Sequence, residues 1–137
     1  MTVKLIKFSK GKRIKNPKGD IIKFISKKNR LFKKFGEMYF SEIKKNKVKG
    51  WNFHGKLSCM LFVPYGKVEF IIYNSFKKKM TKTILSDKNL NILNIPSKNW
   101  FCFKSLVKKS IIANILDGTH DPTEVKKSNK IRNIIIK

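Results

Sequence analysis

Two histidines are the residues of this chain best suited to exchange protons near neutral pH, and they lie in different surroundings. His54 stands in the sequence FHGK (53–56), directly before a long apolar run. If this segment is extended, the side chains of His54 and Lys56 share one face, because strand side chains alternate between two faces. The ammonium group then disfavours the imidazolium form, so His54 could act as a base. Lys56 could stabilise an oxyanion formed beside the abstracted proton.

The same residues also fit a plainer interpretation, in which His54 is a loop histidine and Lys56 is one of many solvated lysines. The second histidine, His120, lies among carboxylates in DGTHDPTE (117–124), which could orient its ring or simply form a surface turn. A metal site has little support, because the chain lacks a His-x-His pair and a suitable third ligand. The sequence contains no glycine-rich phosphate loop and no nucleophile motif.

Short strands are the elements that must position these residues. Apolar or alternating segments recur at a spacing of roughly 8–12 residues between polar turns, which is typical of a β-sandwich or barrel. The run 57–63 is almost continuously apolar, as expected for a strand buried on both faces. The charged segment 44–49 is expected to be a loop. We expect strands at 2–8, 20–26, 36–44, 57–63, 67–73, 81–86, 90–95, 100–107 and 110–116.

The stretch Gly50–Asn74 is the one around which the other segments are organised. Its two apolar runs meet at Pro64-Tyr65-Gly66. Proline, which has no backbone N–H, fits a position that donates no hydrogen bond to a neighbouring strand, and glycine is free to take a positive φ. We therefore expect a β-hairpin here, with His54 carried just before its first strand.

Length and composition predict one folded domain over residues 1–137, with a motif-bearing core at about 36–125 and a lysine-rich tail at 126–137. The hydrophobic fraction of 41% supports a folded chain. No apolar run approaches the ~20 residues that cross a bilayer, and the N-terminus lacks a signal-peptide stretch. We therefore expect a cytoplasmic protein with no membrane partner. Cys59 and Cys102 lie in apolar runs and are expected to be buried free thiols.

A formal net charge of +25 favours anionic partners in general. Only three of the 33 basic residues are arginines, however, and arginine is the preferred residue for contacts to phosphates and bases. The lysines are also scattered along the whole chain. Nucleic acid is therefore not the expected partner, although a basic nucleic-acid-binding β-barrel stays open as an alternative.

Four segments occur in a distinctive order: GEMYFSEIKKNKVKGWNFHGK (36–56), VPYGKVEFIIY (63–73), IPSKNWFCFKSL (95–106) and IIANILDGTHDPTEV (111–125). They resemble, in turn, a strand and loop that deliver a Trp and a His, a first hairpin, a second hairpin, and a segment ending in Asp-Pro-x-Glu. Together they are similar to small RmlC-like cupins related to dTDP-4-dehydrorhamnose 3,5-epimerase. The resemblance implies an all-β fold, a cupin-type double-stranded β-helix or jelly-roll barrel.

The resemblance also implies an activity. His54 falls where the family has its catalytic base, and Lys56 near the basic residue that contacts the sugar enolate. The chain would then be an epimerase or keto-isomerase acting on a nucleotide-activated 4-keto-6-deoxy sugar, with no metal and no cofactor. A metal cupin would carry a second histidine and a glutamate in the first motif, where this chain has Lys56 and SCMLF (58–62).

Further site roles follow from the same resemblance. In the family a tyrosine acts as the acid, and His120 or Tyr73 is the candidate for that role here. The family orients its base with an aspartate near the C-terminus, and the ending KSNKIRNIIIK offers no such residue. The surplus lysines could hold the pyrophosphate, and the contacts to sugar and nucleobase are expected from Trp51, Trp100, Phe103 and Lys104.

Small cupins of this branch usually form dimers, and edge strands at 2–8 or 131–136 would otherwise be open. We therefore expect a homodimer, in which strands could be exchanged. Besides the nucleic-acid-binding barrel, a second alternative keeps the fold without the chemistry: a cupin that binds a sugar nucleotide or a protein partner.

Overall fold

The computed structural model describes residues 4–131 and 134–135, and every regular element in them is a β-strand. The expected all-β class is therefore confirmed. The strands are β1 (Lys7–Lys10), β2 (Lys12–Ile14), β3 (Ile21–Lys23), β4 (Glu37–Lys44), β5 (Val48–His54), β6 (Cys59–Tyr65), β7 (Lys67–Asn74), β8 (Lys79–Ser86), β9 (Asn91–Ile95), β10 (Trp100–Ser105), β11 (Lys109–Leu116), β12 (Val125–Lys127), β13 (Lys130–Ile131) and β14 (Ile134–Ile135).

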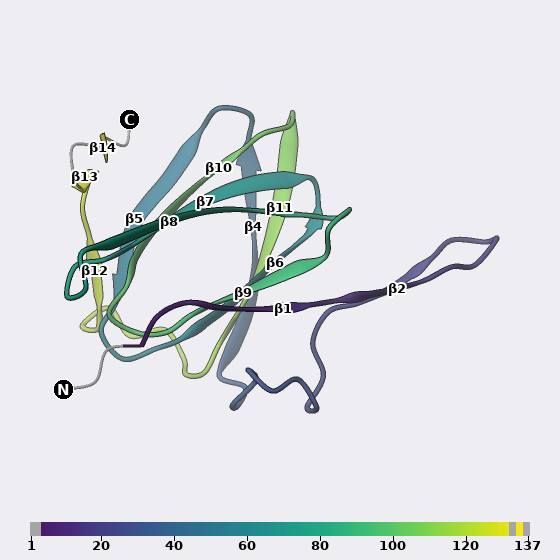
Figure 1. The fold of residues 1–137 in the computed structure, drawn as a ribbon, viewed down its shortest axis with the longest axis horizontal. Helices are drawn as coiled ribbons and strands as arrows, with labels where there is room; N and C mark the ends of the chain where they lie inside the picture. The colour runs from purple at the N-terminus through teal and green to yellow at the C-terminus, as the bar shows by residue number, and fades with distance from the viewer. Residues whose placement is uncertain (1–3, 132–133, 136–137) are drawn as a thin grey trace.

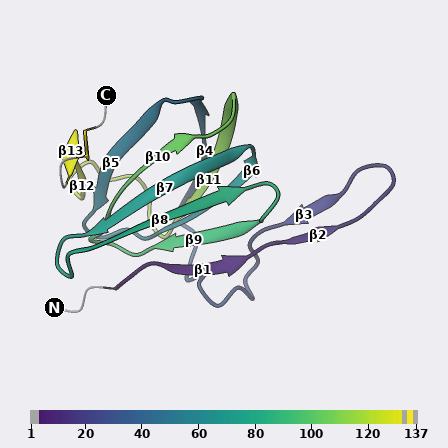
Figure 2. The same cartoon turned by 45° about the horizontal axis from the view of Figure 1, so that its top comes forward.

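Ten of these strands form two antiparallel sheets that face each other (Figures 1 and 2). Sheet 1 has the order β1-β9-β6-β11-β4, and sheet 2 has the order β12-β5-β10-β7-β8. From β4 to β7, and again from β8 to β11, every connection carries the chain from one sheet to the other. Only β7 and β8 are both consecutive and paired within these two sheets. This alternation is the topology of a jelly roll.

The expected β-hairpin over Gly50–Asn74 is wrong. β6 pairs with β9 and β11 in sheet 1, whereas β7 pairs with β8 and β10 in sheet 2. The turn between them is a corner that joins the two sheets, with Gly66 at φ +101°. The Gly66 amide donates to Oδ2 of Asp87 at 3.1 Å. A turn signal indicates where the chain reverses, but the strand partners are chosen by long-range packing.

Most strand positions agree with expectation. β3, β4 and β6 to β11 overlap the predicted segments, and β6 is buried over residues 59–63 as its apolar run predicts. β1 begins later than predicted, and β2 was not predicted. β5 begins at Val48, within the segment 44–49 that was expected to be a charged loop. Of the predicted edge strand at 131–136, Ile131 belongs to β13, 134–135 form β14, and the rest lies outside the described residues.

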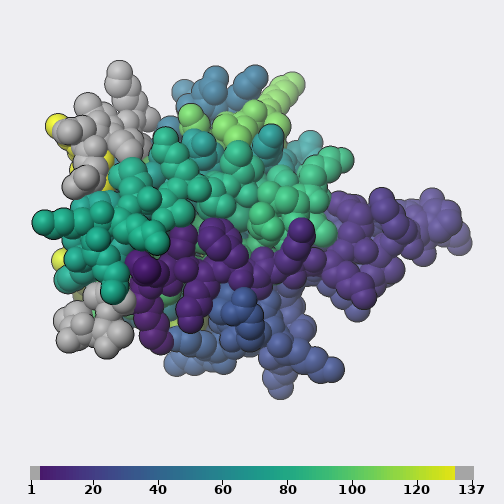
Figure 3. Space-filling view, in the orientation of Figure 1, coloured from purple at the N-terminus to yellow at the C-terminus, as the bar shows by residue number. Residues whose placement is uncertain are grey.

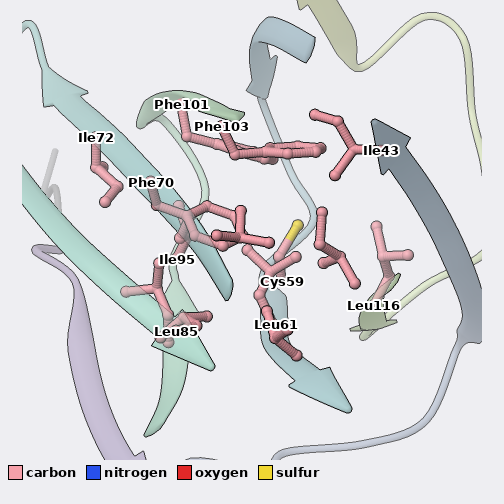
Figure 4. Close-up of a cluster of buried hydrophobic side chains, with 14 residues drawn as sticks. Ile43, Cys59, Leu61, Phe70, Ile72, Leu85, Ile95, Phe101, Phe103 and Leu116 are labelled. Atoms are coloured by element: carbon pink, nitrogen blue, oxygen red, sulfur yellow. The ribbon is translucent and has the colours of Figure 1, made fainter. Parts of the chain in front are cut away.

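The main core fills the space between the two sheets (Figure 4). Its aromatic part comes from Phe70, Phe101 and Phe103, whose rings lie 5.2 to 6.4 Å apart. Both cysteines are buried free thiols, as predicted. Burial raises the pKa of each thiol to about 12, so both stay protonated. The aliphatic members of this core include Ile43, Leu61, Val63, Val68, Ile72, Leu85, Leu93, Ile95, Ile112 and Leu116.

Two chain segments cover the outer faces of the sheets. The segment 24–32 packs Phe24, Leu31 and Phe32 onto the outer face of sheet 1. On sheet 2, the backbone of Ser128 exchanges hydrogen bonds with that of Trp51 at 2.9 and 3.2 Å. The C-terminal segment is thereby attached to the outer edge of β5, which places β12 beside the end of that strand.

The β2–β3 ladder forms an arm that projects away from the two sheets (Figures 1 and 3). Arg13 holds the arm together and ties it to the body. Its guanidinium contacts Asp20 at 3.2 Å and donates to the carbonyl oxygen of Asp87 at 2.7 Å. In the described part of the chain, no helix is long and apolar enough to pass through a membrane.

Candidate active site

A cavity of about 140 Å³ lies between the sheets, where β4 and β11 of sheet 1 face β5 and β10 of sheet 2. One part of its wall is apolar and the other part is polar. The apolar lining is Leu61, Phe101, Phe103 and Ile112, and the polar lining is Tyr39, Ser41, Lys49, Asn52, His54 and Asn114.

The alternation of strand side chains explains this lining. On β4, Tyr39 and Ser41 line the cavity, and Met38 and Phe40 alternate with them on the outer face. Tyr39 is 42% exposed, so its side chain lies where the cavity meets the solvent. On β10, Phe101 and Phe103 line the cavity, so Trp100 is directed to the outer face of sheet 2.

The polar wall contains a paired histidine and carboxylate. Nδ1 of His54 lies 2.5 Å from Oε2 of Glu124, and the two side chains are 13% and 1% exposed. The other carboxylate oxygen, Oε1, accepts hydrogen bonds from the backbone amides of Lys56 and Leu57 at 3.0 and 2.9 Å. Glu124 directly precedes β12, in which Val125 pairs with His54 of β5. Strand pairing therefore brings together two residues that are 70 positions apart.

The electrostatics of this pair define which histidine nitrogen is available. Burial raises the pKa of the Glu124 carboxyl, but the hydrogen bonds from Leu57, His54 and Lys56 outweigh burial and hold the pKa below its ordinary value. The ionised carboxylate accepts from Nδ1–H, so a neutral His54 carries its lone pair on Nε2. The ring also stacks on Phe101, with 6.4 Å between centroids and 19° between planes. The geometry therefore holds an oriented imidazole base at the cavity wall.

A tyrosine and an asparagine form a second polar pair in the cavity. Nδ2 of Asn114 donates to the hydroxyl of Tyr39 at 3.0 Å, across the register pair that joins β11 to β4. Burial is the main cause that raises the pKa of Tyr39 above its ordinary value, although the bond from Asn114 acts in the opposite direction. The phenol therefore keeps its proton at neutral pH and can donate it.

Lys49 crosses from sheet 2 to sheet 1 at the side of the cavity. Its Nζ donates to Oγ of Ser41 at 2.9 Å and to the carbonyl oxygen of Glu42 at 2.7 Å. Both acceptors are uncharged oxygens, so the ammonium is held in place with its positive charge available to an anion.

Among the predicted catalytic residues, only His54 lines the cavity. β5 ends at His54, so the expected shared face with Lys56 does not form; Lys56 is exposed and only its backbone amide reaches the site. His120 is exposed, and its amide donates to Glu37 at 3.3 Å. Tyr73 is buried on the outer face of sheet 2.

Among the predicted substrate-binding residues, only Phe103 lines the cavity. Trp51 is fully buried with Tyr73 and Cys102 in the cluster under the C-terminal segment. Trp100 packs beside Phe53, with 5.0 Å between ring centroids. Lys104 points outward as well and lies 3.9 Å from Glu69. These positions follow from the alternation of side chains along the strands. The sequence prediction did not take this alternation into account for β10.

Six polar residues of the site were not predicted: Tyr39, Ser41, Lys49, Asn52, Asn114 and Glu124. Glu124 stands in the Asp-Pro-x-Glu segment that carried part of the resemblance, so a local signal for it was present. The alternation of side chains along 36–44 could have predicted that Tyr39 lies on the same face as Ser41. Nothing local distinguishes Lys49 from the other lysines or Asn114 from a surface asparagine.

Comparisons with known proteins test the fold independently. No family model and no curated protein sequence matches the chain. Solved structures do match. A dTDP sugar isomerase from Desulfovibrio desulfuricans superposes with a TM-score of 0.85 at 24% identity, covering 90% of this chain and 83% of that one. A dTDP-4-dehydrorhamnose 3,5-epimerase from Bacillus anthracis, with TDP and PPi bound, gives 0.81 at 18% identity, covering 89% and 77%.

A third match is a mutant of a sugar 3,4-ketoisomerase from Thermoanaerobacterium thermosaccharolyticum in complex with TDP-4-keto-6-deoxyglucose. Its TM-score is 0.79 at 18% identity, and the alignment covers 93% of this chain and 90% of that one. All three matches extend over most of both chains, so the whole architecture is shared. The protein therefore has the cupin jelly-roll fold of the RmlC-like dTDP-sugar epimerases and isomerases.

Proposed function

We propose that this chain is an enzyme that removes the proton next to the keto group of a nucleotide-linked 4-keto-6-deoxy sugar and returns it by epimerisation or keto-isomerisation. The single observation that carries the proposal is the His54–Glu124 pair at the wall of an internal cavity. A carboxylate that fixes the tautomer of a histidine and supports its protonated form is a recurring device for general base catalysis.

The other polar residues of the cavity supply the remaining steps. His54 Nε2 takes the proton from the sugar carbon next to the keto group. The electrons of the broken C–H bond form a double bond to the carbonyl carbon, and the carbonyl oxygen becomes the enolate oxygen. Glu124 stabilises the imidazolium that forms. Tyr39 donates its proton to the enolate oxygen or to carbon, and the ammonium of Lys49 lowers the energy of the negative charge. Return of the proton to the opposite face of the same carbon gives the epimer. In keto-isomerisation the proton returns to the former carbonyl carbon, whose oxygen keeps the proton from Tyr39, while the hydroxyl on the neighbouring carbon gives its proton to the Tyr39 phenolate and becomes the new carbonyl.

The size of the cavity supports a sugar ring as its occupant. At about 140 Å³ it is smaller than the ~300–1,000 Å³ of pockets that enclose drug-sized ligands. The nucleoside diphosphate would then lie outside the cavity, where a chain of net charge +25 favours an anionic group. Lys49 takes over the role that the sequence assigned to Lys56.

The non-catalytic alternative rests on two points, the lack of the family's aspartate to orient His54 and the lack of an identified acid. Glu124, 2.5 Å from His54, supports the catalytic proposal on the first point. Tyr39 supports it on the second as a candidate acid in the same cavity. No contact or charge arrangement in the described residues favours the nucleic-acid-binding alternative over the sugar nucleotide.

Solvent exchange tests the proposal directly. We expect the wild-type protein to incorporate deuterium next to the keto group of dTDP-4-keto-6-deoxyglucose in D₂O, as measured by mass spectrometry. His54→Asn should lower this rate by roughly 10²–10⁴-fold, the usual contribution of a general base. His120→Asn is the matched control and should keep the wild-type rate, because His120 is exposed and outside the cavity. Equal rates for wild type and His54→Asn would reject His54 as the base, and wild-type binding without exchange would favour the binding-only alternative.

A further inference from the structure

A β-bulge in β5 turns three polar side chains toward the cavity. In a regular strand Lys49 and Asn52 would point to opposite faces, because they are an odd number of positions apart. The register of β5 against β10 shifts between Phe101 and Cys102, so β5 has one extra residue at this point. The extra residue brings Lys49 and Asn52 onto one face, and His54 follows two positions after Asn52. All three therefore line the cavity.

Asn52 differs from the other two residues because the protein leaves its amide unused. Lys49 donates to Ser41, and His54 is paired with Glu124. Asn52 is only partly buried, and its side chain forms no hydrogen bond to a described residue. Its amide is therefore free both to donate to and to accept from a molecule in the cavity.

Strand β12 places a lysine beside this amide. In the antiparallel ladder of β12 and β5, Lys127 is directly opposite Asn52. Such residues point to the same face of a sheet, with Cβ atoms about 4.5–5.5 Å apart. The preceding Lys126 confirms the alternation, because its Nζ lies 5.3 Å from the centre of the Phe53 ring, which packs beside Trp100 on the outer face. Lys127 is therefore exposed on the cavity side of sheet 2.

The mouth of the cavity lies at the edges of the two sheets. Tyr39 lines the cavity and is 42% exposed on β4, the edge strand of sheet 1, and β12 is the edge strand of sheet 2 beside β5. Residues 37–43 of β4 include two glutamates and no basic residue. Lys127 on β12 forms no salt bridge within the described residues. An anion at the mouth is therefore attracted to the β12 side rather than to the β4 side.

We propose that Lys127 binds the diphosphate of the nucleotide-linked sugar at the mouth of the cavity, and that Asn52 beside it hydrogen-bonds the sugar ring. The inference rests on the function proposed above. Successive side chains on one face of a strand are about 7 Å apart, since each residue adds ~3.4 Å. With the reacting carbon at His54, the far side of the sugar ring reaches Asn52 and the anomeric diphosphate reaches Lys127. The ammonium then makes charge-assisted hydrogen bonds to the phosphate oxygens.

Calorimetric titration with dTDP tests the role of Lys127. Lys127→Gln should weaken binding by about fivefold to tenfold, because a charge-assisted bond to the diphosphate is lost. Lys126→Gln is the matched control. It removes the same charge from the same strand but on the opposite face, so the Kd should stay within about twofold of wild type. Lys127→Arg keeps the charge and should restore binding. The difference between wild type and Lys127→Gln should shrink as salt is added, because ions screen an exposed contact.

A second ligand separates Asn52 from Lys127. dTDP-glucose carries a hexose but no keto group, so it is not converted during the titration. Asn52→Ala should weaken the binding of dTDP-glucose by about fivefold. It should leave the Kd of dTDP unchanged, because dTDP has no hexose, and the unchanged Kd also shows that the variant is folded. If Asn52→Ala does not fold, Asn52→Val gives the same comparison. Lys127→Gln should weaken both ligands by the same factor.

Each outcome supports or overturns a stated part of the inference. Equal losses in Lys126→Gln and Lys127→Gln would mean that only net charge matters and would overturn the role of Lys127, as would an unchanged Kd in Lys127→Gln. An unchanged Kd of dTDP-glucose in the folded Asn52 variant would overturn the sugar contact. These results would leave the proposed function intact, because deuterium exchange tests it separately. If the wild-type protein binds neither ligand, the proposed function falls and this inference falls with it.

Discussion

Glu124 determines which nitrogen of His54 can act as the base. Its carboxylate accepts from Nδ1 at 2.5 Å and is held by two backbone amides. Glu124→Gln keeps an oxygen for those amides but presents an NH₂ group to His54. Nδ1 must then accept, the ring proton moves to Nε2, and the base is lost. We expect the deuterium exchange rate to fall by roughly 10²–10⁴-fold while the circular dichroism spectrum is unchanged. A rate within a few-fold of wild type would contradict this role.

The same residue gives a prediction for stability against pH. The pKa of Glu124 in the folded protein lies below its ordinary value of 4.5. Folding therefore favours the ionised form, so the stabilisation is complete above pH 4.5 and is lost as the pH falls through the lower folded value. Denaturant titrations should find wild type and Glu124→Gln differing by a constant amount from pH 7 to about 5. The difference should shrink below that range, whereas a gap that widens in acid would contradict the sign.

The corner between β6 and β7 depends on one glycine. Gly66 has φ +101°, and a Cβ at this position would lie 2.8 Å from the Cα of Ser110, a backbone atom that cannot move aside alone. Gly66→Ala should lower the free energy of unfolding by about 1–3 kcal/mol in guanidinium titrations. Gly19→Ala is the matched control, because Gly19 has φ +128° but no atom within 4 Å of the added methyl group. Equal losses in the two variants would mean that the contact with Ser110 costs nothing.

The strands illustrate which parts of a sheet are predictable. The apolar run of β6 and the alternation of β4 located those elements, because each pattern depends on the strand's own side chains. The start of β5 was not predicted, because its sequence is charged and has no strand pattern. Lys49 is in a strand because it pairs with β10 and its side chain bonds to Ser41 of β4. Strand partners were mispredicted at Pro64-Tyr65-Gly66 because a turn signal does not say which sheet the chain enters next.

The outer face of sheet 1 carries exposed apolar side chains that suit a second copy of the chain. Met38, Phe40 and Tyr65 are 41%, 65% and 57% exposed, and β4 is an edge strand whose outer side is unpaired in the two sheets. Light scattering should find about twice the monomer mass of 16.0 kDa. Phe40→Glu should shift the mass toward the monomer. Phe76→Glu, at a similar 59% exposure in the β7–β8 turn, should not. A wild-type monomer at all concentrations would reject the homodimer.

By itself the sequence determined the all-β class, the order of the central strands and the buried thiols, and it indicated His54 as the candidate for proton transfer. These depend on side-chain patterns and residue chemistry that act over a few positions. Only the tertiary structure decided what surrounds His54. Glu124 reaches it through the pairing of β12 with β5, and Tyr39 and Asn114 reach the same cavity through the pairing of β4 with β11. Which strands pair depends on burial summed over both sheets, so local spacing could not show that these residues lie in the same cavity as His54.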